Sequence, residues 1–321
     1  MKLFVTGAAG FIGSNYVRHV LTTTDHEVTI YDALTYAGNV ESIRDVLDDR
    51  RCELVHADIC HADDVARAMD GHDAVVHFAA ETHVDRSILD GSAFVRTNCI
   101  GTNVLCDVAH QVGVERFLHI STDEVYGSVE EGSSSEGDVL EPRSPYSAAK
   151  AGSDLIALSY RTTYGLPVLV TRCSNNYGPY QFPEKMIPLF TTNLIDGQQV
   201  PLYGDGLNVR DWIHVEDHNR AAHLVFEEGE PGEIYNIGAH NELTNADITQ
   251  RLLALTGRDE SAIQWVPDRL GHDRRYSVNI DKITALGWTL QREFDAGLEH
   301  TVEWYRDHRD WWEPLKARVG L

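Results

Sequence analysis

The feature that most constrains the fold is a glycine-rich turn that follows a short apolar segment. Lys2 to Thr6 has the pattern of a β-strand, and Gly7-Ala8-Ala9-Gly10-Phe11-Ile12-Gly13 leads into a helical pattern from Phe11 to Leu21. Glycines spaced Gly-x-x-Gly-x-x-Gly permit a tight turn and let backbone N–H groups approach an anion at the helix N-terminus. The turn therefore predicts a strand–helix unit with an anion-binding end.

Short apolar segments then alternate with helical patterns. This alternation predicts parallel strands joined by right-handed crossovers, and hence a doubly wound, Rossmann-type α/β sheet. After about residue 170, closely spaced prolines and glycines predict a smaller, mixed α/β lobe. We expect units at 1–171 and 172–321, with an approximate boundary that chain segments can cross. Beyond the first strand, the expected elements are strands Glu27–Tyr31, Cys52–His56, Ala74–Phe78 and Arg116–Ser121, and a helix over Ser92–Val112.

Composition narrows the class of protein. The 321 residues carry a formal net charge of −23, which disfavours nucleic-acid binding because phosphates would be repelled. Only five of the 27 basic residues are lysines, and this acidic, lysine-poor composition leads us to hypothesise a salt-adapted host. Neither a signal peptide nor a membrane-spanning segment of roughly 18 apolar residues is evident, so we expect a cytoplasmic protein. The five cysteines lack zinc or redox spacing, and no metal is expected.

A second signal places a dinucleotide at the glycine turn. Asp32 ends the second strand, 19 residues after Gly13, where a carboxylate can accept hydrogen bonds from the adenosine ribose. Its charge would repel a 2′-phosphate, so NAD is favoured over NADP. Asp58 can reach the adenine, although a helix cap is an alternative role. The residues expected at the cofactor, besides Tyr146 and Lys150 below, are Gly7, Gly10, Phe11, Ile12, Gly13, Asp32, Ala33, Leu34, Thr35, Asp58, Ile59, Phe78, Ala79, Ala80 and Thr97.

Tyr146 and Lys150 lie four residues apart, directly after Pro145, which suits the first position of a helix. Residues at this spacing share a helix face. A nearby ammonium stabilises a phenolate, so we expect a lowered pKa that makes Tyr146 a base near neutral pH. Lys150 can also hold the nicotinamide ribose. An ordinary solvated helix face has the same spacing, but the dinucleotide signal favours a catalytic pair.

Two adjacent carboxylates, Asp123 and Glu124, follow the strand Arg116–Ser121. The carboxyl end of such a strand lies beside the cofactor. Like charges placed together raise one pKa, so one carboxyl can act as an acid while its neighbour acts as a base. The hydroxyl of Thr122 can bind the reacting oxygen of a substrate. The alternative is a surface turn that happens to carry two charges.

These motifs give the chain a resemblance to the extended short-chain dehydrogenase/reductase family, the NAD-dependent epimerases and dehydratases. Within that family it looks like the dTDP-glucose 4,6-dehydratases, and the Thr-Asp-Glu triplet and the Asn175–Gln181 run are the most specific matches. Ala8 and Leu270 depart from residues that relatives often carry. The matching segments are Gly7–Gly13, Ala79–Ser87, Thr122–Gly127, Ser144–Lys150, Arg172–Gln181, Pro183–Lys185, Tyr203–Gly206, Arg210–Trp212, Asp268–Arg269 and Gly271–Asp273.

The resemblance implies a hydro-lyase mechanism in three stages. Tyr146 removes the C4 hydroxyl proton while hydride leaves C4 for NAD, and Thr122 orients the C4 oxygen. Glu124 then takes the C5 proton and Asp123 protonates the departing C6 hydroxyl, so that water is lost. Hydride returns to C6, which regenerates the tightly bound NAD in each turnover. The product would be a dTDP-4-keto-6-deoxy-glucose.

The resemblance also implies that the second lobe binds the nucleotide diphosphate. The residues expected at the substrate, besides Thr122, are Thr82, Arg86, Asn175, Lys185, Arg210, Asn245, Asp268, Arg269 and His272. The base is assigned by resemblance only, because CDP- or UDP-glucose would satisfy the same phosphate contacts. A homodimer built from Ser92–Val112 and the helix of Tyr146 is likewise implied. His214 and His218 have a spacing typical of metal ligands, but we interpret them as ordinary residues at a helix start.

Two other functions stay open. A nucleotide-sugar 4-epimerase of the same fold needs Tyr146, Lys150 and NAD, but no acid and base for C5 and C6. The carboxylate pair Asp123 and Glu124 therefore argues against it. A non-catalytic, NAD-binding regulatory module is the alternative from another class, and an intact set of catalytic side chains argues against that.

Overall fold

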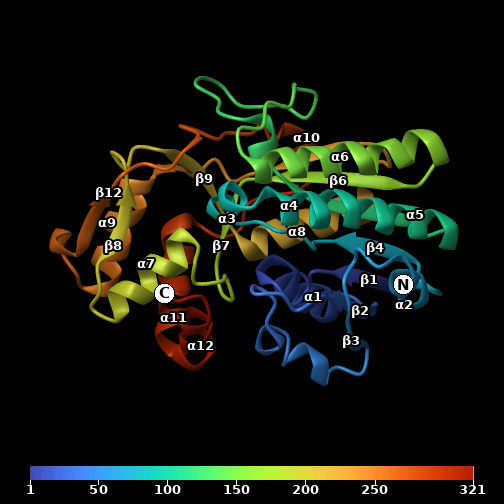
Figure 1. Cartoon of the computed structure of the whole chain (residues 1–321), viewed down its shortest axis with the longest axis horizontal. Coiled ribbons are helices and arrows are strands. Elements are labelled where there is room, and N and C mark those ends of the chain that lie inside the picture. The colour runs from blue at the N-terminus through green and yellow to red at the C-terminus, as the bar shows by residue number, and fades with distance from the viewer. Residues whose placement is uncertain (321) are drawn as a thin grey trace.

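The computed structural model describes residues 1–320, and its largest element is a seven-stranded parallel sheet (Figure 1). The strand order is β10-β6-β5-β4-β1-β2-β3, so the order reverses between β1 and β4. In an open α/β sheet, ligands bind at the carboxyl ends of the strands beside such a reversal. The strands are β1 (Lys2–Thr6), β2 (Glu27–Asp32), β3 (Cys52–His56), β4 (Ala74–His77), β5 (Arg116–Thr122), β6 (Val168–Cys173) and β10 (Ile234–Ile237).

Helices cover both faces of this sheet, because its strands are apolar on both sides. One hydrophobic core joins the sheet to α1 (Phe11–Thr23), α8 (Val215–Glu228) and α10 (Asp281–Ala285). The opposite core contains α2 (Ala62–Met69), α5 (Thr102–Val112) and α6 (Pro145–Tyr164). Between these elements lie α3 (Val84–Leu89), α4 (Gly91–Phe94), the π-helical η3 (Val95–Gly101) and the 3₁₀ turns η1 (Val40–Ser42), η2 (Val46–Asp48) and η4 (Asp123–Tyr126).

The second lobe is smaller and has a core of its own. Its sheets have the orders β11-β9-β7, which mixes parallel and antiparallel pairs, and β12-β8. In Figure 1 this lobe lies beside the large sheet, at the left of the view. Its elements are β7 (Asn175–Tyr177), α7 (Met186–Ile195), β8 (Val200–Tyr203), β9 (Val209–His214), β11 (Glu242–Thr244), α9 (Asn245–Thr256), η5 (Glu260–Ala262), β12 (Ile263–Val266), α11 (Phe294–Asp307) and α12 (Arg309–Val319).

The predicted fold class, a doubly wound sheet with a smaller mixed lobe, is confirmed. The expected strands all form, within one residue at each end. The chain crosses the boundary expected near residue 171, because β10 pairs with β6 at the edge of the large sheet. The helix expected over Ser92–Val112 is divided, because η3 interrupts it with a π-helical segment. No helix within residues 1–320 combines the length and the hydropathy needed to cross a membrane.

Candidate active site

The glycine turn presents free backbone amides at the start of α1. Gly10 is the N-cap, no side chain of residues 1–320 caps the helix, and its first turn holds no acidic residue. A Cβ on Gly7 would lie 2.5 Å from the backbone nitrogen of Ala79, and one on Gly13 would lie 2.7 Å from the Cα of Ala8. Gly7 is therefore required for close packing against the end of β4, and Gly13 for the close approach of backbone within the turn itself. The positive helix end thus remains open to an anion.

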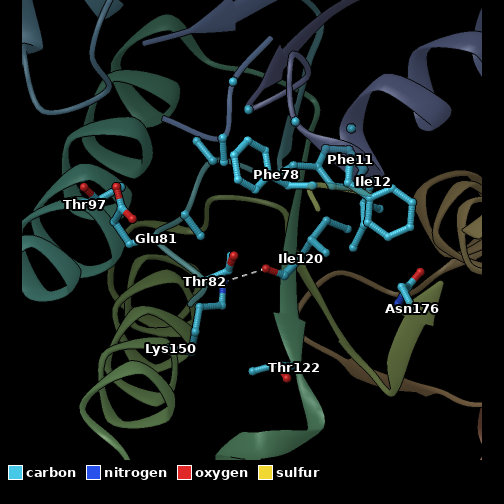
Figure 2. Close-up of a pocket in the computed structure, with 18 of the residues that line it drawn as sticks. Phe11, Ile12, Phe78, Glu81, Thr82, Thr97, Ile120, Thr122, Lys150 and Asn176 are labelled. Atoms are coloured by element: carbon cyan, nitrogen blue, oxygen red, sulfur yellow. Dashed lines mark hydrogen bonds between the residues drawn. The ribbon is translucent and has the colours of Figure 1, made fainter. Parts of the chain in front are cut away.

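The amides open into a cavity of about 330 Å³ that runs along the carboxyl ends of the strands. Its volume is within the range of small-molecule sites. Every residue expected at the cofactor lines it except Leu34. The five expected catalytic residues line it as well, so the structure brings together the two groups that the sequence separates. Figure 2 shows Phe11, Ile12 and Phe78 on one side of this space and Lys150 and Thr122 on the other.

Asp32 is buried at the cavity wall and is bonded to the turn itself. One carboxylate oxygen accepts from the amide of Ala9 at 2.9 Å, and the other accepts from the amide of Leu34 at 2.8 Å. Each carboxylate oxygen can accept a further bond, so Asp32 can also receive a ribose hydroxyl. Asp58 accepts from the amide of Cys60 at 2.8 Å. It is not a helix cap, because the N-cap of α2 is His61.

Tyr146 and Lys150 lie in the first two turns of α6. Ser144 and Ser147 form a capping box around Pro145, which fixes where this helix begins. The Lys150 ammonium donates to the carbonyl oxygen of Ile120 on β5 at 2.7 Å (Figure 2). This bond holds the lysine between α6 and the sheet, at the wall of the cavity.

The expected lowering of the Tyr146 pKa is wrong for this structure. Burial raises the pKa of the phenol well above its ordinary value, the charge of Glu124 adds to the effect, and Thr122 opposes it by hydrogen bonding. Lys150 is four residues away on the same helix face, but its ammonium is bonded to Ile120 rather than to the phenol. Desolvation therefore outweighs the stabilisation of the phenolate that the spacing suggested.

Asp123 and Glu124 form the first residues of η4, a single turn that Thr122 caps by accepting from the amide of Glu124. The side chain of Asp123 is buried, and among residues 1–320 its Oδ2 has no hydrogen-bond partner. Burial raises the pKa of Asp123 well above its ordinary range, and the neighbouring charge of Glu124 raises it further. Asp123 therefore keeps its proton at a pH where an ordinary aspartate is ionised.

Glu124 has a different electrostatic environment. Burial raises its pKa, but three cations from other elements act in the opposite direction. In order of effect they are Arg269, Lys185 and Arg210. Each cation is held by a different partner. Lys185 donates to the carbonyl oxygen of Thr82, and Arg210 donates to that of Asp273. Arg269 pairs with Asp85 at 3.6 Å. The two neighbouring carboxyls therefore have unlike surroundings: three cations oppose the raised pKa of Glu124, and of these only Arg210 also opposes that of Asp123.

The residues expected at the substrate divide into two groups. Thr82, Asn175 and Lys185 line the cavity together with Thr122, whereas the others are outside its lining. Arg86 pairs with Glu184 at 3.1 Å, and His272 is hydrogen-bonded to Asp268 at 2.6 Å. Arg210 stacks on the ring of Tyr276 at 4.3 Å, and Asn245 is the buried first residue of α9. Arg210 and Arg269 nevertheless act on the cavity through Glu124.

Several lining residues were not predicted. Glu81, Ser121, Cys173, Ser174, Asn176, Gln181, Phe182 and Glu184 are among them. The runs Arg172–Gln181 and Pro183–Lys185, which carry part of the family resemblance, could have indicated five of these residues. Glu81 lies within the matching segment Ala79–Ser87, and Ser121 ends the expected strand Arg116–Ser121, so both could have been found from the rule that sites form at strand ends.

Comparison with known proteins decides the family. The family described as GDP-mannose 4,6 dehydratase matches residues 4–301. This chain belongs to that family. Two curated members named dTDP-glucose 4,6-dehydratase, from Streptomyces antibioticus and Streptomyces niveus, are 55% and 54% identical to it. Each alignment covers 99% of this chain and 96% of the relative.

Solved structures of related proteins have the same fold as this chain. The dTDP-glucose 4,6-dehydratase DesIV from Streptomyces venezuelae, crystallised with NAD, is 54% identical and superposes with a TM-score of 0.97. That match covers 98% of this chain and all of the other. A UDP-glucose 4-epimerase from Thermus thermophilus, in complex with NAD, is 30% identical with a TM-score of 0.90, over 96% of this chain and all of the epimerase. The fold is therefore common to both activities, and only the site can separate them.

Proposed function

We propose that this protein is an NAD-dependent hydro-lyase that converts dTDP-glucose into dTDP-4-keto-6-deoxy-glucose and water. The observation that carries the proposal is the pair of adjacent carboxyls that line the cavity in unlike surroundings. Asp123 is buried, its pKa is raised, and among residues 1–320 its Oδ2 has no hydrogen-bond partner. Its neighbour Glu124 lies among cations, and both line the same cavity as Tyr146 and Lys150. Elimination of water across a C–C bond needs one acid and one base at adjacent carbons. Full-length relatives with this name support the same activity.

The cavity fits NAD. The free amides of α1 would bind its pyrophosphate, and glycines without side chains would let it approach them closely. Asp32 would hold the adenosine ribose and disfavour a 2′-phosphate, and Lys150 would hold the nicotinamide ribose. When bound, NAD would supply the hydride acceptor for C4 of the sugar and the hydride donor for C6, so that no external reductant is consumed.

Tyr146 and Thr122 act on the C4 hydroxyl. Thr122 lies at the end of β5, where its Oγ1 can receive or give a hydrogen bond to the sugar oxygen. Tyr146 takes the C4 proton, for which it must first be ionised. Because burial disfavours the phenolate, positive charge in the site is needed, and we expect the Lys150 ammonium, one turn along α6, to contribute to it when substrate and cofactor are bound.

Glu124 and Asp123 carry out the elimination. A ketone at C4 acidifies the hydrogen on C5, and ionised Glu124 takes that proton. The C6 hydroxyl then leaves with the proton that Asp123 holds, which gives water and a C5–C6 double bond. After hydrogen is returned to C6, Glu124 gives its proton back to C5. The diphosphate is held by Lys185, Arg210 and Arg269, whose charges already converge on this part of the site.

One assay tests the function. Purified protein is mixed with dTDP-, CDP- and UDP-glucose, and products are identified by mass and NMR. We expect loss of water from dTDP-glucose and a 4-keto product with alkaline absorbance. Conversion to a galactose epimer would establish the epimerase instead, and NAD binding without turnover of any nucleotide sugar would favour a regulatory module.

We also propose a cytoplasmic homodimer. Large apolar side chains are exposed on neighbouring helices, which is typical of an interface. They are Ile88 and Leu89 on α3, Val95 and Ile100 on η3, and Leu155 and Tyr164 on α6. A Leu155→Glu variant should sediment as a monomer, whereas Val139→Glu, at an exposed apolar residue outside these helices, should not change the native state. A native monomer would contradict the proposal. The cytoplasmic location is supported by the free cysteines and by the proposed nucleotide-sugar substrate.

A further inference from the structure

A buried ion pair lies behind the site, and no step of the proposed reaction uses it. Asp154 is on α6, one turn after Lys150, and its Oδ2 accepts from the Nε of Arg172 on β6 at 2.9 Å. The Nε2 of His119 lies 3.2 Å from the other carboxylate oxygen. The exposed fractions of Asp154 and Arg172 are 0% and 2%. Burying two charges is costly and is often no gain in stability, so this pair needs another explanation.

Another nitrogen of the Arg172 guanidinium contacts η4, the turn that carries the acid and the base. The Nη1 of Arg172 donates to the hydroxyl oxygen of Tyr126 at 2.9 Å, and the guanidinium carbon lies 4.9 Å from the centre of the ring. Tyr126 is the last residue of η4, which begins at Asp123. The Tyr126 hydroxyl in turn donates to Asn236 on β10 at 2.8 Å. A continuous chain of hydrogen bonds therefore joins α6 to η4.

This chain connects the two halves of the catalytic machinery. Tyr146 and Lys150 are on α6, whereas Asp123 and Glu124 are on η4, and the same sugar must meet both in succession. Groups that act on one substrate must be held within about 0.5 Å of the productive geometry. The planar fork of an arginine suits this, because it bonds to two partners in fixed directions. We propose that Asp154, Arg172 and Tyr126 are positioning residues that hold η4 against α6, an inference that rests on the proposed dehydration.

The decisive variant is Tyr126→Phe in the full chain with NAD, because it removes one hydroxyl and keeps the ring. We expect kcat for dTDP-glucose to fall about tenfold to a hundredfold while KM stays unchanged, since a small misplacement of a catalytic group has effects of this size. We also expect a larger isotope effect on kcat with C5-deuterated dTDP-glucose, because removal of the C5 hydrogen becomes the slow step. A merely structural role would lower the folded fraction and leave the isotope effect unchanged.

Tyr235→Phe is the matched control. Tyr235 is also buried, and its hydroxyl accepts from the amide of Glu230, a residue of neither α6 nor η4. If the Asp154→Asn protein folds, it should show the same fall in kcat and the same larger isotope effect as Tyr126→Phe. If Asp154→Asn does not fold, the Tyr126→Phe variant alone tests the positioning role. A Tyr126→Phe protein with the kcat and isotope effect of the control would overturn the positioning role. Native protein without turnover of dTDP-glucose would instead overturn the proposed function and, with it, this inference.

Discussion

The carboxylate of Asp32 accepts a hydrogen bond from the amide of Ala9 at 2.9 Å, which ties the end of β2 to the glycine turn. One residue thus shapes the turn and lines the cavity, where it would bind the adenosine ribose. We predict that Asp32→Ala weakens NAD binding about tenfold to a hundredfold, the range for losing hydrogen bonds to a charged group. The preference for NAD over NADP should also narrow, because the charge that repels a 2′-phosphate is gone. Calorimetric titration with both dinucleotides measures this.

Asp58→Ala is the comparison for that prediction. Asp58 lines the same cavity, but its side chain accepts from Cys60 and does not contact the turn. We expect a smaller loss of NAD affinity and no change in the NADP ratio. Equal NAD affinity in native and Asp32→Ala proteins would refute the role of Asp32.

Gly13→Ala should disrupt the turn. The added Cβ would lie 2.7 Å from the Cα of Ala8 and from the carbonyl oxygen of Gly7, and these backbone atoms cannot move cheaply. Overpacking of this kind costs about 1–3 kcal/mol, so we expect a lower midpoint in urea unfolding and weaker NAD binding. Gly137→Ala is the control, since a Cβ there would meet no atom of the described residues within 4 Å. Equal midpoints for the two variants would show that the close approach is absent in solution.

Asp123→Asn removes the acid and keeps the shape of the side chain. We predict that kcat for dehydration falls about 10²- to 10⁴-fold, the usual contribution of a general acid. Exchange at C5 should persist, because Glu124 can still take that proton from a C4 ketone. Product formation is followed by alkaline absorbance, and exchange by deuterium uptake into recovered dTDP-glucose.

Glu124→Gln should show the opposite pattern for exchange. Without a base at this position, deuterium uptake at C5 and dehydration should both be lost. Full dehydration rates in Asp123→Asn would mean that another group is the acid, and full exchange in Glu124→Gln would mean that another group is the base.

The raised pKa of Asp123 also predicts how stability depends on pH. Above the ordinary pKa of 3.8, the folded protein retains a proton that the unfolded chain has lost, so this group lowers the free energy of unfolding as pH rises toward its folded pKa. Asp123→Asn removes that penalty. Its stability relative to the native protein should therefore increase by up to about 1.4 kcal/mol per pH unit in that window. Urea unfolding at several pH values tests this, and a pH-independent difference would contradict it.

Much of the site could be predicted because it is local in sequence. The turn Gly7–Gly13, the pair Tyr146 and Lys150, and the neighbours Asp123 and Glu124 each lie within one segment, and one sheet edge brings them together. The electrostatics could not be predicted in the same way. The pKa of Tyr146 depends on burial, and the cations around Glu124 come from segments that only the second lobe places near η4.

The interruption of the helix expected over Ser92–Val112 could not be predicted from the sequence either. Apolar periodicity over Ser92–Val112 is continuous, so it predicts one helix and cannot reveal the π-helical η3. A Cβ on Gly101, within η3, would lie 2.4 Å from the side chain of Ile59. Ile59 follows β3, so the packing at this point joins segments about forty residues apart in the sequence.

The return of β10 to the large sheet bears on how the protein is made. A ribosome releases residues 1–171 long before Ile234–Ile237, so the sheet lacks its edge strand for much of synthesis. Tyr126 cannot bond to Asn236 until that strand has emerged. We therefore expect a fragment that ends near residue 171 to fold poorly alone, and the nascent chain to gain protease resistance only after β10 leaves the exit tunnel.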